Sequence, residues 1–269
     1  MTRLVQLLAT SAVACALAAG AQAGDKEIPR QVSFGGSCVK CELSGRNLSG
    51  ARIIGANFSY STLVGAVLRD AKFQASVFVG ADLTRADLSD ASMTGANFSG
   101  ANLTSARLRS TEANGVVFNS AILTRADLAD IEATGANFGR AHLNGASLTG
   151  GDFSHASFRS TDLSGANLSG GSFDGADFKD ADISRTTLIG VDLSGVRGLT
   201  QDQVDEACAD SHTRLPRGLI ARGCTVSARW IMRRDQPRPR ITIVPSVPAV
   251  APAPPAPPAA PRYLSSVTR

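Results

Sequence analysis

The sequence predicts an all-β solenoid in which the chain turns a corner after every fifth residue and stacks each coil on the last. Two periods lead to this prediction. Every fifth residue from Leu43 to Leu193 is Leu, Ile, Phe or Met, apart from Ala113 and Ala133, which gives 31 units without an insertion. Phenylalanine also recurs every twenty residues, at Phe58, Phe78, Phe98, Phe118, Phe138, Phe158 and Phe178. A fixed period of this kind is the signature of a solenoid.

A period of five suits neither a helix, whose neighbours lie three or four residues apart, nor a flat strand, whose side chains alternate. The twenty-residue period implies four corners in each coil. Sorting the unit centres by this rule gives four columns: one of Leu ending in Ile183, one of Leu throughout, one that is mixed, and a fourth of Phe alone. Columns of this purity are expected where each side chain packs on its equivalent one coil away.

A second, smaller inward position is predicted two residues before each centre, where Ala stands in 19 of the 31 units. Where the centre shrinks to Ala133, this slot grows to Ile131, and beside Ala113 it holds Thr111. A core packed at crystal-like density would demand such an exchange of volume. Gly ends 16 of the units, where a corner would need a permissive backbone.

The units Ala-Asp-Leu-Thr-Arg (81–85), Ala-Asn-Phe-Ser-Gly (96–100) and Ala-Asn-Leu-Ser-Gly (166–170) resemble the consensus of the pentapeptide-repeat family. The resemblance covers about 41–195. It implies a right-handed quadrilateral β-helix of about eight coils, with the unit centre and the residue two before it pointing inward. Because stacked strands lie about 4.8 Å apart, such a rod would be roughly 37 Å long.

Residues 1–23 predict a secretory signal peptide. Arg3 supplies the positive start, residues 4–20 are apolar, and Ala21-Gln22-Ala23 forms an A-x-A cleavage site. A lipoprotein signal through Cys15 is a weaker alternative, because Ala12 stands where Leu is usual. The mature chain would begin at Gly24, in the periplasm or outside the cell, without a membrane span. Disulfides persist in such a compartment.

Four cysteines remain after cleavage: Cys38, Cys41, Cys208 and Cys224. Their paired spacing invites a zinc interpretation, but the pairs flank opposite ends of the rod, so one metal could not gather all four unless the tail doubled back. Cys38, in an N-terminal cap over 24–40, and Cys41, at the first small inward slot of the repeats, are expected to close the bottom of the core as a disulfide or as buried thiols. A Cys208–Cys224 disulfide would close the C-terminal cap and stabilise it by about 3 kcal/mol. No metal or cofactor is expected.

Residues 196–234 predict a helical, basic C-terminal cap. Thr200 is the expected N-cap, Gln203 completes a capping box, and Asp202 suits the helix dipole. Residues 198–208 and 213–219 resemble the C-terminal cap of many bacterial members of the family. Such a cap is needed because an exposed stacking face invites aggregation.

The end of the chain is basic and then rich in Pro and Ala. Eight Arg stand between 214 and 240 against one acid, Asp235, and possible contact residues among them are Arg229, Trp230, Arg233 and Arg234. Residues 235–269 cannot bury a core and are expected to be disordered. This tail could meet anionic envelope polymers or an aromatic groove.

The predicted rod has 12 basic and 16 acidic residues, and its outward positions form ladders with a step of twenty. One ladder holds Glu112, Glu132 and Asp152. Stacked acids repel one another, so this ladder could mark a cation site or the footprint of a basic partner. It could equally be drift on a tolerant, solvated face.

The sequence favours a non-catalytic protein. It has no Ser-His-Asp arrangement and no phosphate-binding loop, and its three histidines lack a metal-binding spacing.

The first hypothesis is an exported repeat scaffold that binds a protein or an envelope component. The resemblance supplies a second, because some family members that confer quinolone resistance mimic DNA and bind gyrase. The predicted export and the early basic residues, such as Arg46, Arg52 and Lys72, weigh against it. No nucleic acid partner is expected. A third hypothesis is a small-molecule or cation binder on the acidic ladder.

Overall fold

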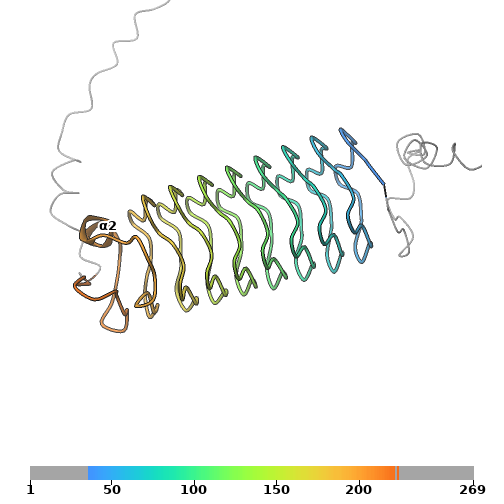
Figure 1. Ribbon diagram of the computed structural model, residues 1–269. Helices are drawn as coiled ribbons and strands as arrows, with labels where there is room; N and C mark the ends of the chain where they lie inside the picture. The colour runs from blue at the N-terminus through green and yellow to red at the C-terminus, as the bar shows by residue number, and fades with distance from the viewer. Residues whose placement is uncertain (1–35, 222, 224–269) are drawn as a thin grey trace, which may run out of the picture. The chain divides into compact units, whose positions relative to one another are not determined.

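The computed structural model describes residues 36–221 and 223 (Figure 1). These residues belong to one compact unit of the chain. Parallel bridges join each coil to the next at a separation of twenty residues, from Ser37–Asn57 to Asp177–Arg197. The ladder therefore starts before residue 41, where the sequence places the first repeat. It also continues into the cap through the pairs Thr187–Cys208 and Asp192–Arg214.

The corners follow the five-residue period. From Lys40 to Gly190 the last residue of every unit has a φ angle between 53° and 70°. At nearly all corners the following amide donates to the carbonyl of the unit centre before it, as from Ala51 N to the Leu48 oxygen at 3.1 Å. Positive φ at the third residue of such a turn is the geometry of type II, which favours Gly. Sixteen of these positions nevertheless hold other residues, so the stacking of coils outweighs the local cost of the left-handed conformation.

The coils satisfy one another's backbone. Leu43 N donates to the Thr62 oxygen at 2.7 Å, and Thr62 N donates back to the Cys41 oxygen at 2.8 Å. The same exchange repeats along the stack. Because the coils pair through isolated bridges and not through longer strands, almost all of the order comes from contact between successive coils.

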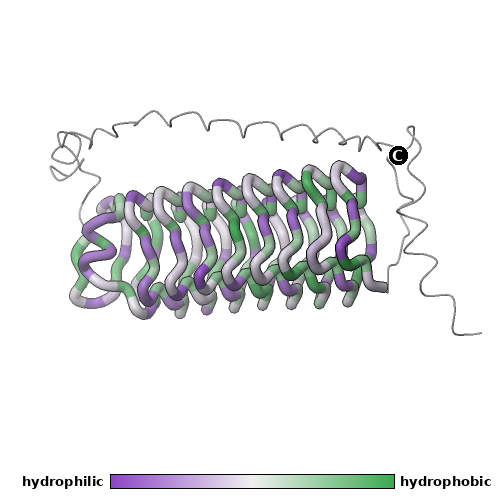
Figure 2. The backbone as a smooth tube through the Cα atoms, turned by 90° about the horizontal axis from the view of Figure 1, so that it is seen from above, coloured by the Kyte–Doolittle hydropathy of each residue, from purple (hydrophilic) through white to green (hydrophobic). Residues whose placement is uncertain are grey.

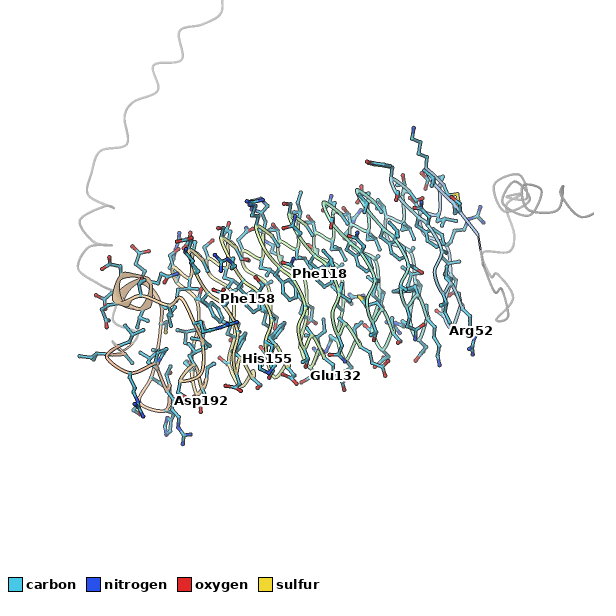
Figure 3. All side chains as sticks on the ribbon, viewed as in Figure 1. Arg52, Phe118, Glu132, His155, Phe158 and Asp192 are labelled. Atoms are coloured by element: carbon cyan, nitrogen blue, oxygen red, sulfur yellow. A yellow bond between two sulfur atoms is a disulfide. The ribbon has the colours of Figure 1, made fainter. Side chains whose placement is uncertain are left out.

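The predicted core is confirmed. All 31 unit centres are buried, including the two small ones, Ala113 and Ala133. The seven phenylalanines of the fourth column stack ring on ring, with successive centroids 4.7–5.4 Å apart. Phe118 and Phe158 lie inside the rod in Figure 3. The tube coloured by hydropathy shows polar and apolar residues alternating along each coil (Figure 2).

The smaller inward slot is confirmed too, and its polar members are satisfied. Five of these slots hold a hydroxyl residue, and all five are buried: Ser61, Ser76, Thr111, Thr161 and Thr186. Each hydroxyl donates to the carbonyl of a unit centre or its equivalent 23 residues earlier, as from Thr111 to Leu88 at 3.1 Å. A buried hydroxyl left without a partner would be costly, so this contact explains why the slot accepts Ser and Thr.

One helix, α2 (Gln201–Glu206), lies within the described residues and covers the last coil (Figure 1). Thr200 is its N-cap and forms the expected capping box with Gln203. Val204, in the middle of the helix, is fully buried. Within residues 36–221 and 223, no helix has the length and the apolar composition needed to cross a membrane.

Candidate interaction surfaces

The third side of the rod is the side whose unit centres form the mixed column. It comprises residues 52–55 and the four-residue segments that follow at steps of twenty, the last of which is 192–195. Its outward column runs through successive bridges in the order Arg52, Lys72, Ser92, Glu112, Glu132, Asp152, Ser172 and Asp192. Arg52, Glu132, His155 and Asp192 lie along one edge of the rod in Figure 3. From residue 92 onward this side carries no Lys or Arg and five acids. Four of the acids lie in the outward column, and the fifth is Asp174.

The predicted acidic ladder exists, but its members differ. Glu112 bridges Glu132, and Glu132 bridges Asp152. The two glutamates are exposed, and neither has an ion-pair partner among the described residues. Asp152 is half-buried and accepts hydrogen bonds from the Ser154 amide at 2.9 Å and from the Thr134 hydroxyl at 3.2 Å. Hydrogen bonds from Ser154 hold the pKa of Asp152 below its ordinary value.

Asp152 illustrates why Asp and Asn recur before the unit centre. At that position their side-chain oxygen accepts the amide of the residue two further on, as from Ser99 to Asn97 at 2.9 Å and from Ser164 to Asp162 at 2.9 Å. This local contact is an Asx turn. Much of the rod's acidic character therefore serves the corner and needs no ligand to explain it. Sequence reasoning missed this role, although the consensus Ala-Asp/Asn-Leu/Phe-x-Gly carries its signal.

The second side, which begins at residues 47–50, differs from the third side because several of its acids form ion pairs with Arg. Arg69 reaches Asp87 at 2.7 Å, and Arg109 lies 3.5 Å from both Asp127 and Asp130. Burial opposes the ionisation of Asp87, yet its hydrogen bonds with Arg69 and Ser89 keep its pKa lowered. Three acids on this side, Asp87, Asp127 and Asp130, are thus neutralised by an Arg one coil away, whereas the two glutamates of the third side have no such partner.

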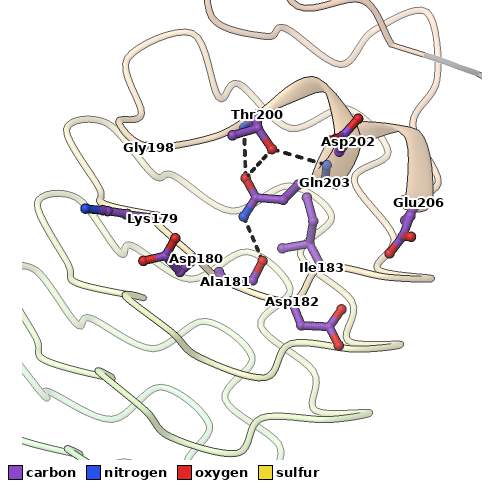
Figure 4. Close-up of a pocket in the computed structure, with 10 residues that line it drawn as sticks. All are labelled: Lys179, Asp180, Ala181, Asp182, Ile183, Gly198, Thr200, Asp202, Gln203 and Glu206. Atoms are coloured by element: carbon purple, nitrogen blue, oxygen red, sulfur yellow. Dashed lines mark hydrogen bonds between the residues drawn. The ribbon is translucent and has the colours of Figure 1, made fainter.

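A cleft of about 620 Å³ lies between the last coil and α2 (Figure 4). Its lining is mainly acidic and small, and comprises Lys179, Asp180, Ala181, Asp182, Ile183, Gly198, Thr200, Asp202, Gln203 and Glu206. Gln203 bridges the cleft by donating to the Ala181 oxygen at 2.7 Å and accepting from the Thr200 amide at 2.8 Å. These lining residues include no histidine, cysteine or serine. Sequence reasoning did not predict the cleft, because it depends on how α2 sits on the coil.

The structure places the predicted cysteine and metal residues as follows. Cys38 and Cys41 form a disulfide at the N-terminal end of the core. Cys208 is also disulfide-bonded. Within the described part of the chain, His, Cys, Asp and Glu form no group of three that could hold a metal ion. Four predicted site residues lie outside the described residues, as does the last cysteine: Cys224, Arg229, Trp230, Arg233 and Arg234.

The chain belongs to the pentapeptide-repeat family. The family model, described as pentapeptide repeats, matches eight copies within residues 37–195. A solved structure of a trypsin-treated variant of QnrB1, a plasmid-mediated fluoroquinolone resistance protein, is 19% identical, with a TM-score of 0.54 over 68% of this chain and 92% of that chain. HetL, a pentapeptide-repeat protein involved in heterocyst differentiation regulation in Nostoc sp. strain PCC 7120, is 28% identical, with a TM-score of 0.35 over 71% and 89% of the two chains. No curated protein matches the chain.

The family and the QnrB1 neighbour imply a right-handed quadrilateral β-helix. This is the fold to which four five-residue corners per coil and a twenty-residue ladder correspond. The pentapeptide-repeat family is generally a non-enzymatic scaffold fold.

Proposed function

We propose that this protein is an exported, non-catalytic scaffold whose rod binds another protein or an envelope component. One observation carries the proposal: the stack runs from Ser37 to Arg197 without an inserted loop. Enzyme sites are usually concave and combine a few convergent polar groups. The rod instead offers flat sides that display short polar and charged side chains in register.

The support for export comes from the sequence. The apolar segment and A-x-A site of residues 1–23 support a signal peptide cleaved after Ala23. The Cys38–Cys41 disulfide is of the kind that persists in an oxidising compartment. The partner would therefore be met in the periplasm or outside the cell.

The test is photo-crosslinking in the producing cells, with a crosslinking amino acid at one outward position on each side of the rod. Suitable positions are Ile122, Ser147, Glu132 and Val117, which precede the unit centres on the first to fourth sides. The proposal predicts an adduct with an exported protein or envelope polymer from one or two sides, and none from the others. If no such adduct formed from any of the four sides, that result would contradict the proposal.

Gyrase binding is the alternative that the same experiment can reveal. Its support is the acidic run of the third side from Glu112 to Asp192. A DNA mimic is expected to be acidic along its length, whereas Arg52 and Lys72 occupy the first two coils of the same column. A crosslink to gyrase, together with inhibition of supercoiling by the purified protein, would replace the scaffold proposal.

A further inference from the structure

The outward column of the third side has its charges sorted by sign along the rod. Arg52 and Lys72 occupy the first two coils, Ser92 the third, and Glu112, Glu132 and Asp152 the next three. None of Arg52, Lys72, Glu112 and Glu132 has an ion-pair partner within residues 36–221. All four are exposed. These four charges are therefore available to something outside the chain.

Over the middle coils, the other outward positions of this side hold short side chains. The residues after the unit centres are Ile54 and Gln74 in the first two coils, and short polar side chains over the middle coils, at Thr94, Asn114, Thr134 and Ser154. The corner row beside them consists of Gly55, Ala75, Gly95, Gly115 and Gly135, and only then of the bulkier His155. The short side chains of the middle coils leave room for a second flat surface to approach the charged column closely enough for contact.

We propose that the third side binds the third side of a second copy of this chain, with the two rods antiparallel. Homodimers are commonly two-fold symmetric, and the two copies then use the same patch. A two-fold axis that lies in the contact plane, across the rods, keeps each column opposite itself and reverses the order of the coils. The basic end of one column therefore meets the acidic part of the other.

One register pairs both basic residues with acids over the longest overlap. With the axis between the coils of Ser92 and Glu112, Arg52 faces Asp152 of the second copy, Lys72 faces its Glu132, and Ser92 faces its Glu112. A longer overlap by one coil would set Glu112 against Glu112. The six-coil register is thus the longest in which no like charges meet. It also places His155, the bulky member of the corner row, opposite Gly55.

The contact would be weak and sensitive to salt. Six coils at about 4.8 Å make a contact roughly 29 Å long, and one side of a narrow rod is small beside a standard protein interface. Complementary charge mainly supplies register and specificity in such contacts. Salt at about 0.5 M, where screening acts over only a few ångströms, should dissociate the pair. This inference is independent of which envelope partner the scaffold binds.

The experiment is sedimentation equilibrium of the purified chain at low salt over a range of concentrations. The proposal expects a reversible dimer that Lys72→Glu and Glu132→Lys each weaken by about tenfold or more, because each creates two like-charge contacts. Mixing the two variants should restore association as a heterodimer. In that heterodimer the two substituted side chains face each other with opposite charge, and the native Lys72 and Glu132 form the other pair. Circular dichroism of each variant establishes that the rod is folded.

Matched controls use the equivalent position on the fourth side. Val117 precedes a unit centre and has Asn97 and Asn137 as its bridge neighbours. Val117→Glu and Val117→Lys should therefore leave the dissociation constant unchanged. A monomer at every concentration would overturn the proposal. A dimer indifferent to Lys72→Glu, or two variants that remain monomeric when mixed, would also overturn it.

Discussion

The third and fourth sides of the rod solve the same packing problem in different ways. On the fourth side every unit centre from Phe58 to Phe178 is Phe, and the rings stack at 4.7–5.4 Å. On the third side the centres range from Ala to Phe, yet all of them are buried. The backbone is the same on both sides, so something other than the centre alone must keep the cross-section constant.

The smaller inward slot supplies the missing volume. On the third side the slot is Ile131 beside Ala133 but Gly151 beside Phe153. A Cβ atom at Gly151 would lie 2.7 Å from the Phe153 ring and 3.0 Å from the Ile131 Cγ2 atom. The core therefore specifies the total volume of centre and slot. A uniform centre, as on the fourth side, is one solution among several.

Removing one ring from the uniform side should have the largest effect. Phe118→Ala deletes a fully buried ring between Phe98 and Phe138. The expected cost is about 3–5 kcal/mol of unfolding free energy, because the two neighbouring rings cannot close the gap in a rigid stack. Chemical denaturation monitored by circular dichroism measures this cost. A loss below about 1 kcal/mol would mean that the Phe column does not determine stability.

Adding a ring to the varied side should cost less. Ala133→Phe introduces a large side chain where Ile131 already fills the slot, and overpacking is expected to cost about 1–3 kcal/mol. The double variant Ile131→Gly, Ala133→Phe copies the Gly151–Phe153 pair and should recover part of that loss. If the double variant is no more stable than the single one, volume exchange between slot and centre is wrong.

Acid should destabilise the rod through the Asx-turn carboxylates. The pKa of Asp192 is lowered by hydrogen bonds from Ser194, and that of Asp210 by the Gly190 amide, His212 and Thr213. A carboxyl group whose pKa is lower in the folded state contributes full stability above its unfolded pKa of about 3.9, and loses it as the pH falls toward the folded value. The melting temperature should therefore be level from about pH 7 to about pH 5 and fall below about pH 4. A maximum at about pH 2–3 would contradict a stabilising role for these carboxylates.

The smallest effect should separate two acids of the same column. Asp152→Ala removes the acceptor for the Ser154 amide and should cost about 0.5–1.5 kcal/mol. Glu132→Ala, one coil away, removes a side chain that makes no hydrogen bond within the described residues and should change stability by less than about 0.5 kcal/mol. Thermal melts of the two variants measure the difference. Equal losses would contradict the Asx-turn explanation of the repeated Asp and Asn.

Much of this fold could be predicted from the sequence, because inward residues recur with a fixed step. The buried centres, the Phe column, the Ile131–Ala133 exchange and the Thr200 cap are confirmed. The surface was harder to predict. A ladder of Glu112, Glu132 and Asp152 looks uniform in sequence, but only the structure shows that Asp152 binds a turn amide. Similarly, the cleft beside α2 depends on how a helix docks, which local patterns do not determine.

The most direct test of an exported scaffold is the intact mass of the protein from fractionated cells, alkylated before any reduction. The account predicts a chain that begins at Gly24, in the periplasmic or culture fraction, with Cys38 and Cys41 protected from alkylation by their disulfide. A full-length chain in the cytoplasm with both thiols alkylated would contradict it. The signal peptide and the envelope partner would then both be wrong, and gyrase would become the first partner to assay.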